Sequence, residues 1–264
     1  MIYLSTDIKK KIKGWNKKNT YIVADFDKTL TKTNCKSSWR VVGESKLVDN
    51  GFQVEGAKLF ATYRPEELRT DLTKKEKDQK MKEWAEKSLD LLIKYEVSEE
   101  TIKELTANNE TLSFKDGAIE FLEKTNKQKI PVLIISAGIR NLITGFLEFK
   151  KCYFNNIIVI GNEIEFKYGK TVGFKNQIIH SNNKNEIELF KKTKEAIKGR
   201  KNKILLGDII GDINMLQKED REGALKIGFL SEEQYFEEYM KAFDIVATGD
   251  TNYQEIQDLI KFLK

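Results

Sequence analysis

Two aspartates one residue apart, Asp25 and Asp27, lie at the end of the apolar run YIVAD (21–25) near the start of the chain. Side chains two positions apart on an extended backbone point to the same side, so the two carboxyl groups should project together. Neighbouring carboxylates repel each other, and the pKa of one should therefore rise. The pair could supply the nucleophile and the proton donor that cleave a phosphate ester through an aspartyl-phosphate. Taken alone, however, an Asp-x-Asp sequence is better explained as an acidic turn.

A second apolar run, PVLIIS (131–136), ends at Ser136 and is followed by Ala137, Gly138 and a helical pattern. The Ser136 hydroxyl can donate a hydrogen bond, and the amides after it would lie at a helix N-terminus, where phosphate groups bind. The alternative is an ordinary serine cap of that helix.

A third apolar run, KILLGD (203–208), continues as GDIIGD (207–212). Its two glycines allow a tight turn that returns Asp208 and Asp212 to the end of the strand, although a capped turn would have the same pattern. Three strand ends that all carry suitable groups are harder to explain as turns. Clustered carboxylates favour a hard metal ion such as Mg²⁺ as the cofactor.

The composition excludes several other kinds of reactive site. The 264 residues include 46 Lys plus Arg, 41 Asp plus Glu, 2 Cys and 1 His. A single histidine, His180, cannot form a multi-histidine metal site, and two cysteines cannot form a zinc ribbon or a disulfide framework. The formal charge is only +5, and most basic residues are Lys rather than the Arg that nucleic-acid readers favour. We therefore expect a solvated lysine surface and no stable nucleic-acid partner.

The same composition indicates where the protein acts. No apolar run is long enough to form a membrane span, and the start of the chain lacks the apolar core of a signal peptide. Cys35 and Cys152 lie far apart in a lysine-rich chain, which favours free thiols in a reducing compartment. We therefore expect a cytoplasmic protein without a membrane partner, and a monomer, with an oligomer left open.

Short apolar runs alternate with helical patterns along most of the chain. This alternation predicts an α/β fold with a Rossmann-like, doubly wound parallel sheet, whose strands share one carboxyl edge. Near-continuous apolar runs are typical of strands buried on both faces. Residues 161–174 should form an inserted hairpin that turns at Tyr168-Gly169. The strands are predicted at 21–25, 131–136, 156–160, 203–208, 224–229 and 243–247, and the helices at 115–129, 139–150, 186–199, 210–218, 232–242 and 253–263.

Residues 46–109 differ from the rest, because they contain several helical patterns and no convincing strand. This stretch is too long for a simple crossover, so we predict a helical cap domain at 46–109 inserted into a core domain formed by 1–45 and 110–264. One helical face of the cap includes a single hydroxyl, Ser88, among apolar side chains. It is either a satisfied core hydroxyl or a group that faces a ligand under the cap, and the pattern leaves both open. The face consists of Met81, Trp84, Ala85, Ser88 and Leu92.

The three strand ends, DFDKTLT (25–31), IISAG (134–138) and LLGDIIGD (205–212), together resemble the haloacid-dehalogenase-like phosphatases. The motifs of that superfamily follow in the order D-x-D-x-T, a strand-end Ser or Thr, a Lys, and G-D-x-x-x-D. The chain is similar in particular to the cytosolic pyrimidine (type III) 5′-nucleotidases, a family that includes enzymes for 7-methylguanosine monophosphate. This resemblance covers nearly the whole chain from about residue 20. Its further stretches are Cys35 to Trp39, MKEW (81–84), IPVLIISAGI (130–139), GFKNQIIHSNNKN (173–185), LKIGFL (225–230) and residues 239–246.

The resemblance implies roles for the aspartates at the strand ends. Asp25 matches the nucleophile, and Asp27 matches the general acid/base that protonates the leaving ribose oxygen and then activates water. The magnesium ligands would be Asp25, the backbone carbonyl of Asp27, and Asp208, with Asp212 supporting them. Because this chemistry needs no imidazole, we expect His180 to be a structural, hydrogen-bonded histidine.

The resemblance also implies which groups bind the phosphate. Ser136 matches the phosphate-binding hydroxyl, with backbone contacts from Ala137 and Gly138. Lys184 matches the lysine that holds the nucleophile and the phosphate, and Lys175 is a competing candidate that spacing alone does not exclude. Magnesium and the lysine would offset the repulsion between a phosphate dianion and two carboxylates.

Substrate selection should lie in the cap. Glu67 aligns with a cap glutamate that contacts the nucleoside in the family, Trp39 with a position that stacks on the base, and Ser88 with another cap contact. Ala85 departs from the family, because an aromatic residue is expected there in the pyrimidine enzymes, and losing one stacking face costs about 1–3 kcal/mol per base. The identity of the base therefore stays open between a pyrimidine and 7-methylguanine.

We expect a magnesium-dependent 5′-nucleotidase that hydrolyses a nucleoside 5′-monophosphate such as UMP, CMP or 7-methyl-GMP. The alternative is a phosphatase of the same type that acts on another small phosphomonoester. A binding module that keeps the fold without catalysis is disfavoured, because binding alone needs no acid/base aspartate such as Asp27.

Overall fold

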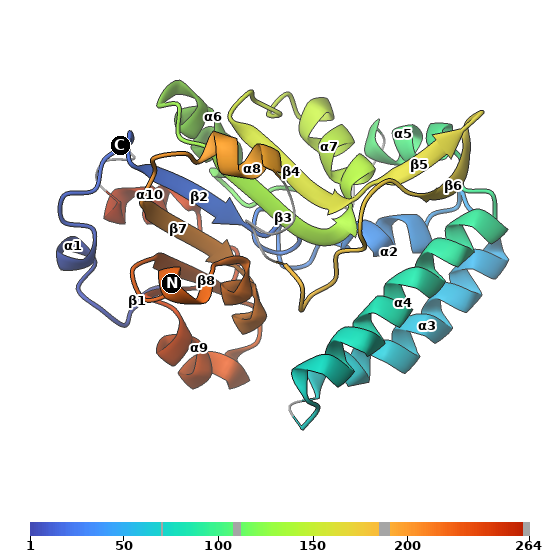
Figure 1. Ribbon diagram of the computed structural model, residues 1–264, viewed down its shortest axis with the longest axis horizontal. Helices are drawn as coiled ribbons and strands as arrows, with labels where there is room; N and C mark the ends of the chain where they lie inside the picture. Colours follow the sequence, from blue (N-terminus) through green and yellow to red (C-terminus); the bar gives the residue numbers. More distant parts are fainter. Residues whose placement is uncertain (70, 108–111, 185–190, 261–264) are drawn as a thin grey trace.

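A seven-stranded sheet forms the centre of the computed structural model, which describes residues 1–69, 71–107, 112–184 and 191–260. The strand order is β1-β9-β8-β7-β2-β3-β4, and neighbouring strands run parallel except β1, which lies antiparallel to β9 at one edge (Figure 1). The predicted α/β fold with a Rossmann-like, doubly wound sheet is therefore confirmed, with one antiparallel edge strand added. The strands are β1 (Ile2–Leu4), β2 (Thr20–Ala24), β3 (Val132–Ile139), β4 (Ile157–Asn162), β7 (Asn202–Gly207), β8 (Leu225–Leu230) and β9 (Ile245–Thr248).

Alternate residues of the strands face two separate hydrophobic clusters. In β2, Ile22 and Ala24 point into a cluster shared with α1, α6, α7 and α10, whereas Tyr21 and Val23 point into a cluster that includes Tyr239 of α9. Because both faces are covered, the strands are apolar along most of their length, as their sequences predicted. The helices are α1 (Ile8–Lys11), α6 (Ala118–Lys127), α7 (Arg140–Phe149) and α10 (Tyr253–Leu259) on the first face, and α9 (Phe236–Ala242) on the second.

The structure differs from the predicted helices in several places. The helix predicted at 210–218 is a 3-10 helix, η1 (Ile210–Met215), followed by η2 (Lys218–Asp220). The tighter turn forms because Asp212 folds back and its carboxylate accepts hydrogen bonds from the amides at the start of the turn. The helix predicted at 232–242 begins with another 3-10 turn, η3 (Glu233–Tyr235).

Three of the shortest elements were not predicted from the sequence pattern. The sequence does not predict β1, α1 or α2 (Ser38–Gly43), because three to six residues show no clear periodicity. Of the helix predicted at 186–199, the structure shows α8 (Lys191–Ala196). Residues 185–190 lie outside the described residues, as does the end of the helix predicted at 253–263.

The hairpin predicted at 161–174 is formed by β5 (Ile164–Lys167) and β6 (Lys170–Phe174). Tyr168 and Gly169 both have positive φ, 51° and 77°, which suits the two-residue turn whose twist matches that of paired strands. A bridge between Ser98 and Lys170 attaches this hairpin to the end of the helical region.

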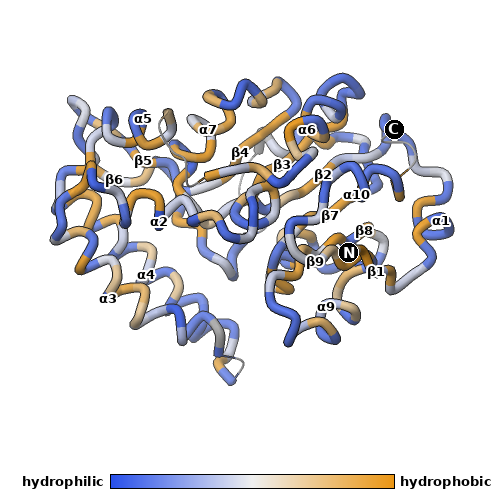
Figure 2. Tube along the Cα trace, turned by 180° about the vertical axis from the view of Figure 1, so that it is seen from behind, coloured by the Kyte–Doolittle hydropathy of each residue, from blue (hydrophilic) through white to orange (hydrophobic). Residues whose placement is uncertain are grey.

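The helical region contains two long antiparallel helices, α3 (Asn50–Leu68) and α4 (Lys74–Lys94). They project from the sheet as a helical hairpin, called here the α3–α4 hairpin, and mostly hydrophilic residues lie toward its tip (Figure 1, Figure 2). Tyr63 stacks on Trp84 with ring centroids 6.1 Å apart, so the two helices hold each other. The domain boundaries at 46 and 109 stay a prediction, and residue 109 is not among the described residues.

The base of the α3–α4 hairpin is anchored to the sheet domain through α5 (Glu99–Ala107). Ile102 and Leu105 of α5 share a hydrophobic cluster with Leu92 of α4 and Leu142 of α7. The hairpin therefore stands on the side of the sheet where β2 and β3 end (Figure 1). No helix formed by the described residues is long and apolar enough to cross a membrane.

Candidate active site

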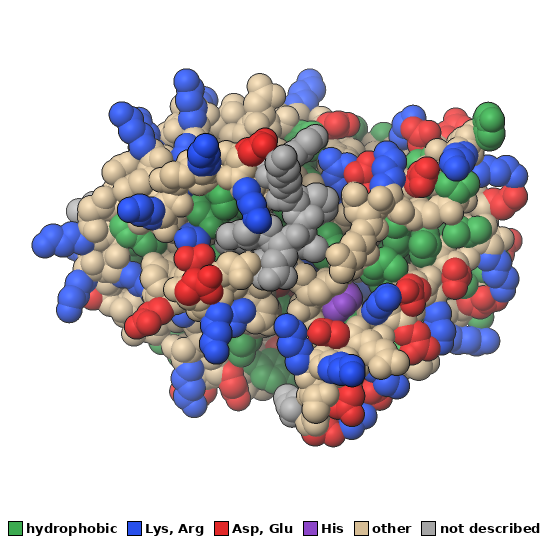
Figure 3. Space-filling view, in the orientation of Figure 1, with side chains coloured by type: hydrophobic (Ala, Val, Ile, Leu, Met, Phe, Trp, Pro, Cys, Tyr) green, Lys and Arg blue, Asp and Glu red, His purple; other side chains and the backbone are tan. Residues whose placement is uncertain are grey.

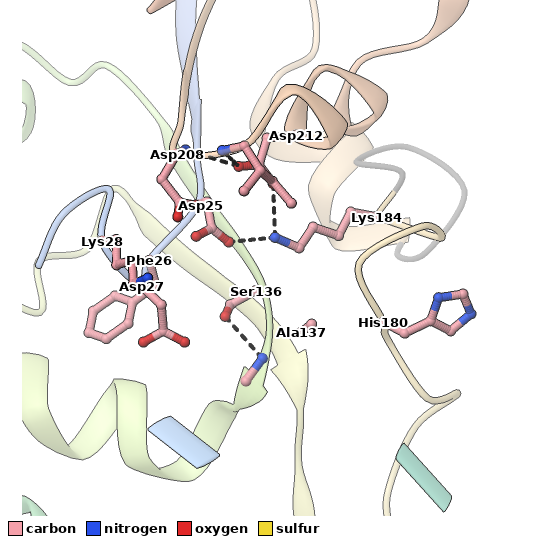
Figure 4. Close-up of polar contacts among 12 residues, drawn as sticks. Asp25, Phe26, Asp27, Lys28, Ser136, Ala137, His180, Lys184, Asp208 and Asp212 are labelled. Atoms are coloured by element: carbon pink, nitrogen blue, oxygen red, sulfur yellow. Dashed lines mark hydrogen bonds and ion pairs between the residues drawn. The ribbon is translucent and has the colours of Figure 1, made fainter. Parts of the chain in front are cut away.

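The parallel register of the central strands brings three predicted site residues to one edge of the sheet. Ala24 pairs with Leu206 of β7 and with Ile134 of β3, so Asp25, Ser136 and Asp208 all lie just beyond these positions (Figure 4). Carboxylate oxygens of Asp25, Asp208 and Asp212 lie within 4.8 Å of one another. The sheet thus gathers acidic groups that are far apart in the sequence.

A buried lysine lies among these carboxylates. The Nζ atom of Lys184 is 2.6 Å from Oδ1 of Asp25 and 3.0 Å from Oδ1 of Asp212, and the lysine side chain is only 6% exposed. Lys175, the competing candidate, is exposed and pairs with Glu163 at 2.9 Å. The geometry therefore places Lys184 rather than Lys175 beside Asp25.

Burial changes the proton affinities of the two aspartates that follow β2. Burial raises the pKa of Asp25 to about 6 even though Lys184 opposes the shift. Burial, together with the charge of Asp25, raises the pKa of Asp27 to about 7. For Lys184, burial favours the neutral form, but Asp212 and Asp25 outweigh it and raise its pKa. At neutral pH the site therefore combines a charged lysine with an aspartic acid that can hold and release a proton.

Ser38, a residue that the sequence reasoning did not select, holds Asp27 in place. Its backbone N–H donates to Oδ1 of Asp27 at 3.2 Å, and its buried hydroxyl accepts from the amide of Ile139 at 3.1 Å. A Cβ atom added to Gly138 would lie 2.1 Å from the Ser38 hydroxyl oxygen. Only glycine therefore allows β3 to approach α2 this closely.

Ser136 lies at the predicted edge, but its backbone setting differs from the prediction. β3 continues to Ile139 and α7 begins at Arg140, so Ser136 is not a helix cap and the amides of Ala137 and Gly138 are not at the helix N-terminus. The Gly138 amide donates instead to the Ser136 hydroxyl at 3.0 Å. The hydroxyl accepts this bond and keeps its own proton available for a ligand oxygen.

Two side chains bind the backbone directly after Ser136, because both donate to the carbonyl oxygen of Ala137. The indole N–H of Trp39 donates to the Ala137 carbonyl at 3.0 Å, and the Asn162 amide donates to it at 2.8 Å. Trp39 also packs edge-on against Phe174, with ring centroids 6.3 Å apart. Trp39 is therefore joined directly to the segment predicted to bind phosphate.

The carboxylate cluster fits a divalent cation. Asp212 is fixed, because Lys184 donates to its Oδ1 and the amides of Asp208 and Ile209 donate to its Oδ2 at 3.1 and 3.2 Å. No described residue donates to the Asp208 carboxylate, and burial with the charges of Asp212 and Asp25 raises its pKa well above its usual value. A hard cation with oxygen ligands would relieve this accumulation of negative charge. The hydroxyl of Tyr239 donates to the Asp208 carbonyl and supports the same loop.

The three residues predicted to select the substrate make their hydrogen bonds and ion pairs outside the carboxylate cluster. Trp39 donates to the carbonyl of Ala137, the residue after Ser136. Glu67 forms an ion pair with Arg64 on α3, and Ser88 donates to the carbonyl of Trp84, one helical turn earlier, at 2.8 Å. Ser88 thus has the internal hydrogen bond of a satisfied hydroxyl, and its predicted ligand contact stays untested.

A cavity of about 560 Å³ lies between α4 and the chain that follows β6. Its apolar wall includes Leu89, Phe174 and Ile178. Asp78 of α4 also lines it, and the Oδ1 atom of Asp78 is buried without a hydrogen-bond partner among the described residues. Sequence reasoning missed Asp78, because nothing distinguishes it from the other charged residues of its helix. The remaining described lining residues are Gln79, Lys82, Asn176, Gln177, His180 and Asn183.

His180 lines this cavity but points away from the aspartates (Figure 4). Its Nδ1 atom accepts a hydrogen bond from the Asn182 amide at 3.3 Å. Burial lowers the pKa of His180, while Asp78 and Glu67 on the α3–α4 hairpin oppose the shift. A hydrogen-bonded histidine without a catalytic contact agrees with the prediction, and its electrostatic interactions indicate that the hairpin faces this cavity.

The sequence matches one family model and several characterised proteins. The model described as pyrimidine 5′-nucleotidase (UMPH-1) matches residues 25–264. The 7-methylguanosine phosphate-specific 5′-nucleotidases of Homo sapiens and Mus musculus are each 30% identical over 252 residues, which cover 92% of this chain and 84% of theirs. The Drosophila melanogaster protein of the same name is 30% identical over 254 residues, covering 92% and 79%.

Solved structures show the same fold. A crystal structure of cytosolic 5′-nucleotidase IIIB bound to cytidine superposes with a TM-score of 0.86 at 28% identity, covering 99% of this chain and 93% of that one. Phosphoserine phosphatase in its apo form gives a TM-score of 0.57 at 20% identity, covering 92% and 98%. The second likeness concerns the fold alone.

Proposed function

The chain belongs to the pyrimidine 5′-nucleotidase (UMPH-1) family of phosphomonoester hydrolases, and we propose that it is a magnesium-dependent enzyme that hydrolyses nucleoside 5′-monophosphates to nucleoside and phosphate. The observation that carries this proposal is the pairing at the end of β2. Asp25 lies 2.6 Å from a buried lysine, and Asp27, two residues on, has a pKa of about 7. Relatives are named as cytosolic, and we propose the same location for this chain.

The two aspartates would divide the reaction between them. A carboxylate oxygen of Asp25 attacks phosphorus, the bond from phosphorus to the ribose 5′-oxygen breaks, and Asp27 gives its proton to that oxygen as the nucleoside leaves. Asp27, now a carboxylate, then takes a proton from water. The resulting hydroxide attacks the aspartyl-phosphate, which releases phosphate and restores Asp25.

The other groups of the site would bind and position the phosphate. Lys184 offers its charged Nζ atom beside Asp25, and Ser136 offers its hydroxyl proton. A magnesium ion would be held by Asp25, the backbone carbonyl of Asp27 and Asp208, and would neutralise charge on the phosphate oxygens. Asp212 would keep the Asp208 loop and Lys184 in position through the three hydrogen bonds that its carboxylate accepts from Lys184, Asp208 and Ile209.

The base would lie between Trp39 and the cavity under α4, with Glu67 and Ser88 as further nucleoside contacts. The buried, unpartnered Oδ1 atom of Asp78 supports this placement, because it can accept a hydrogen bond from the base. The exocyclic amino group of cytosine or of 7-methylguanine, or the ring N–H of uracil, could be the donor.

A phosphate-release assay with purified protein tests the proposal. In the presence of Mg²⁺ the enzyme should hydrolyse CMP and 7-methyl-GMP, and chelation with EDTA should stop the reaction. Asp25→Asn should remove turnover while the thermal unfolding curve stays cooperative. Turnover of phosphoserine or a sugar phosphate with no turnover of any nucleoside monophosphate would overturn the substrate assignment and favour another small phosphomonoester.

A further inference from the structure

A second cavity, of about 500 Å³, lies between the first turn of α4 and the segment around η2. Half of its described lining residues are cations, Lys74, Lys77, Lys218 and Arg221, and none of the described ones is acidic. Figure 3 shows basic side chains on both sides of the hollow between the sheet domain and the α3–α4 hairpin. The remaining described lining residues are Asn182, Asn214, Leu216 and Gln217.

These positive charges are not neutralised within the described part of the protein. Lys74, Lys77 and Lys218 form no ion pair with any described residue. Farther along α4, by contrast, Lys87 pairs with Glu83 at 2.7 Å and Lys94 pairs with Glu55 at 2.6 Å. Lys74 and Lys77 also stand in the first turn of α4, where the helix dipole disfavours cations. An anion in the cavity would remove both unfavourable interactions.

An unused hydrogen-bond donor points to the same conclusion. The side-chain Nδ2 atom of Asn182 is buried and has no acceptor among residues 1–69, 71–107, 112–184 and 191–260. Asn182 lines the basic cavity, so a ligand oxygen there could supply the missing acceptor. Arg221 uses its Nε atom for the Leu216 carbonyl and keeps its other N–H groups for a ligand.

We propose that this basic cavity binds a polyphosphate chain, the chemical group shared by inorganic tripolyphosphate and nucleoside triphosphates. Four cations match the several negative charges of such a chain, and Leu216 is the only apolar side chain among the described lining residues. Because the cations come from both α4 and the sheet domain, the anion offsets their repulsion and ties the α3–α4 hairpin to the domain. None of the described lining residues belongs to the proposed reaction centre, and the proposal does not depend on the nucleotidase activity.

Isothermal titration calorimetry with sodium tripolyphosphate, in EDTA and without magnesium, tests the proposal. Lys77→Ala/Lys218→Ala should weaken binding by about tenfold or more, because two charge-assisted hydrogen bonds are lost. The matched control is Lys75→Ala/Lys80→Ala, which removes the same charge from exposed positions of α4 outside the cavity. An equal loss in both double variants, or no loss in the first, would overturn the proposal.

Two further titrations locate the anion and its source. Ser136→Ala should leave tripolyphosphate binding unchanged, and a loss in this variant instead would place the anion in the reaction centre and overturn the proposal. A nucleoside triphosphate that binds as tightly as tripolyphosphate identifies the phosphate chain as the whole ligand. Tighter nucleotide binding that still requires Lys77 and Lys218 supports the site with a nucleotide as its source.

Discussion

The ion pairs Lys184–Asp25 and Lys94–Glu55 have the same N–O distance, 2.6 Å, but opposite surroundings. The first lies at the carboxyl edge of the sheet, where the lysine side chain is 6% exposed. The second lies on the α3–α4 hairpin, where the two side chains are 56% and 38% exposed. Water screens the second pair, whereas the first pair has exchanged its hydration for fixed partners. Equal geometry therefore does not mean equal energy.

The same difference in burial distinguishes the residues proposed for catalysis from those proposed for substrate selection. At the sheet edge, parallel strands position each reactive group, and burial adjusts its pKa. On the hairpin, polar side chains such as Glu67 and Ser88 bond mainly to their own helix and leave the ligand contact to be made when substrate binds. We therefore expect substitutions at the edge to affect catalysis and folding strongly, and substitutions on the hairpin to affect substrate choice.

Asp27→Asn should have the largest effect. The amide cannot transfer a proton to the leaving oxygen, so kcat should fall by roughly 10²–10⁴-fold, as steady-state phosphate release would measure. Asp78→Asn, a matched change in the cavity under α4, should alter the preference among bases and change kcat much less. A kcat for Asp27→Asn within tenfold of the wild type would contradict the acid/base assignment.

Lys184→Met should have the next largest effect, and on stability as well as activity. Removing the lysine leaves Asp25 and Asp212 buried without their cation, which should cost about 3–5 kcal/mol of the free energy of unfolding. Urea unfolding in EDTA at pH 7.5 measures this loss. A loss below 1 kcal/mol would show that the buried and exposed pairs do not differ as described.

The pH dependence of stability in the metal-free protein tests the same burial. The pKa values of Asp25 and Asp27 are about 6 and about 7 in the folded protein, above their usual 3.8. Between pH 3.8 and about 7 the folded state therefore binds more protons than the unfolded state. The stability that these two protonated carboxyl groups contribute is lost as the pH rises through their folded-state pKa values. The free energy of unfolding should fall from pH 5 to pH 8, by on the order of 3 kcal/mol. Asp27→Asn should flatten this dependence, and a stability that rises over the same range would contradict the raised pKa values.

Trp39→Ala should weaken nucleotide binding by about 1–3 kcal/mol, because one stacking partner for the base is lost. The expected result is a higher KM for CMP with little change for glycerol phosphate, which has no base. Trp84→Ala is the control, because Trp84 stacks on Tyr63 inside the hairpin. If Trp39→Ala slows both substrates equally, its role is to position the Ala137 carbonyl rather than to contact the base.

Lys94→Met should have the smallest effect. Its pair with Glu55 is largely exposed and screened by water, so the free energy of unfolding should change far less than in Lys184→Met. The same urea titration used for Lys184→Met provides the comparison. A loss as large as that of the buried lysine would remove the distinction between the two regions.

The α/β fold and the three strand ends that carry Asp25, Ser136 and Asp208 could be predicted from the sequence alone. Doubly buried parallel strands require near-continuous apolar runs, and such runs are visible one segment at a time. Because parallel strands all end at one edge of a sheet, the polar residues that follow them could be predicted to meet. Short-range patterns therefore carried this information.

The groups outside the strands that contact these residues could be identified only from the folded structure. Lys184 lies 159 positions from Asp25, and spacing alone could not choose between it and Lys175. The contacts of Ser38 with Asp27 and of Asp78 with the cavity depend equally on how α2 and α4 pack. The turn at 210–218 became a 3-10 helix because Asp212 folds back onto its own loop. Such contacts depend on how segments distant in the sequence pack together. Packing of this kind produces no periodic pattern in the sequence, so it could not be predicted from one.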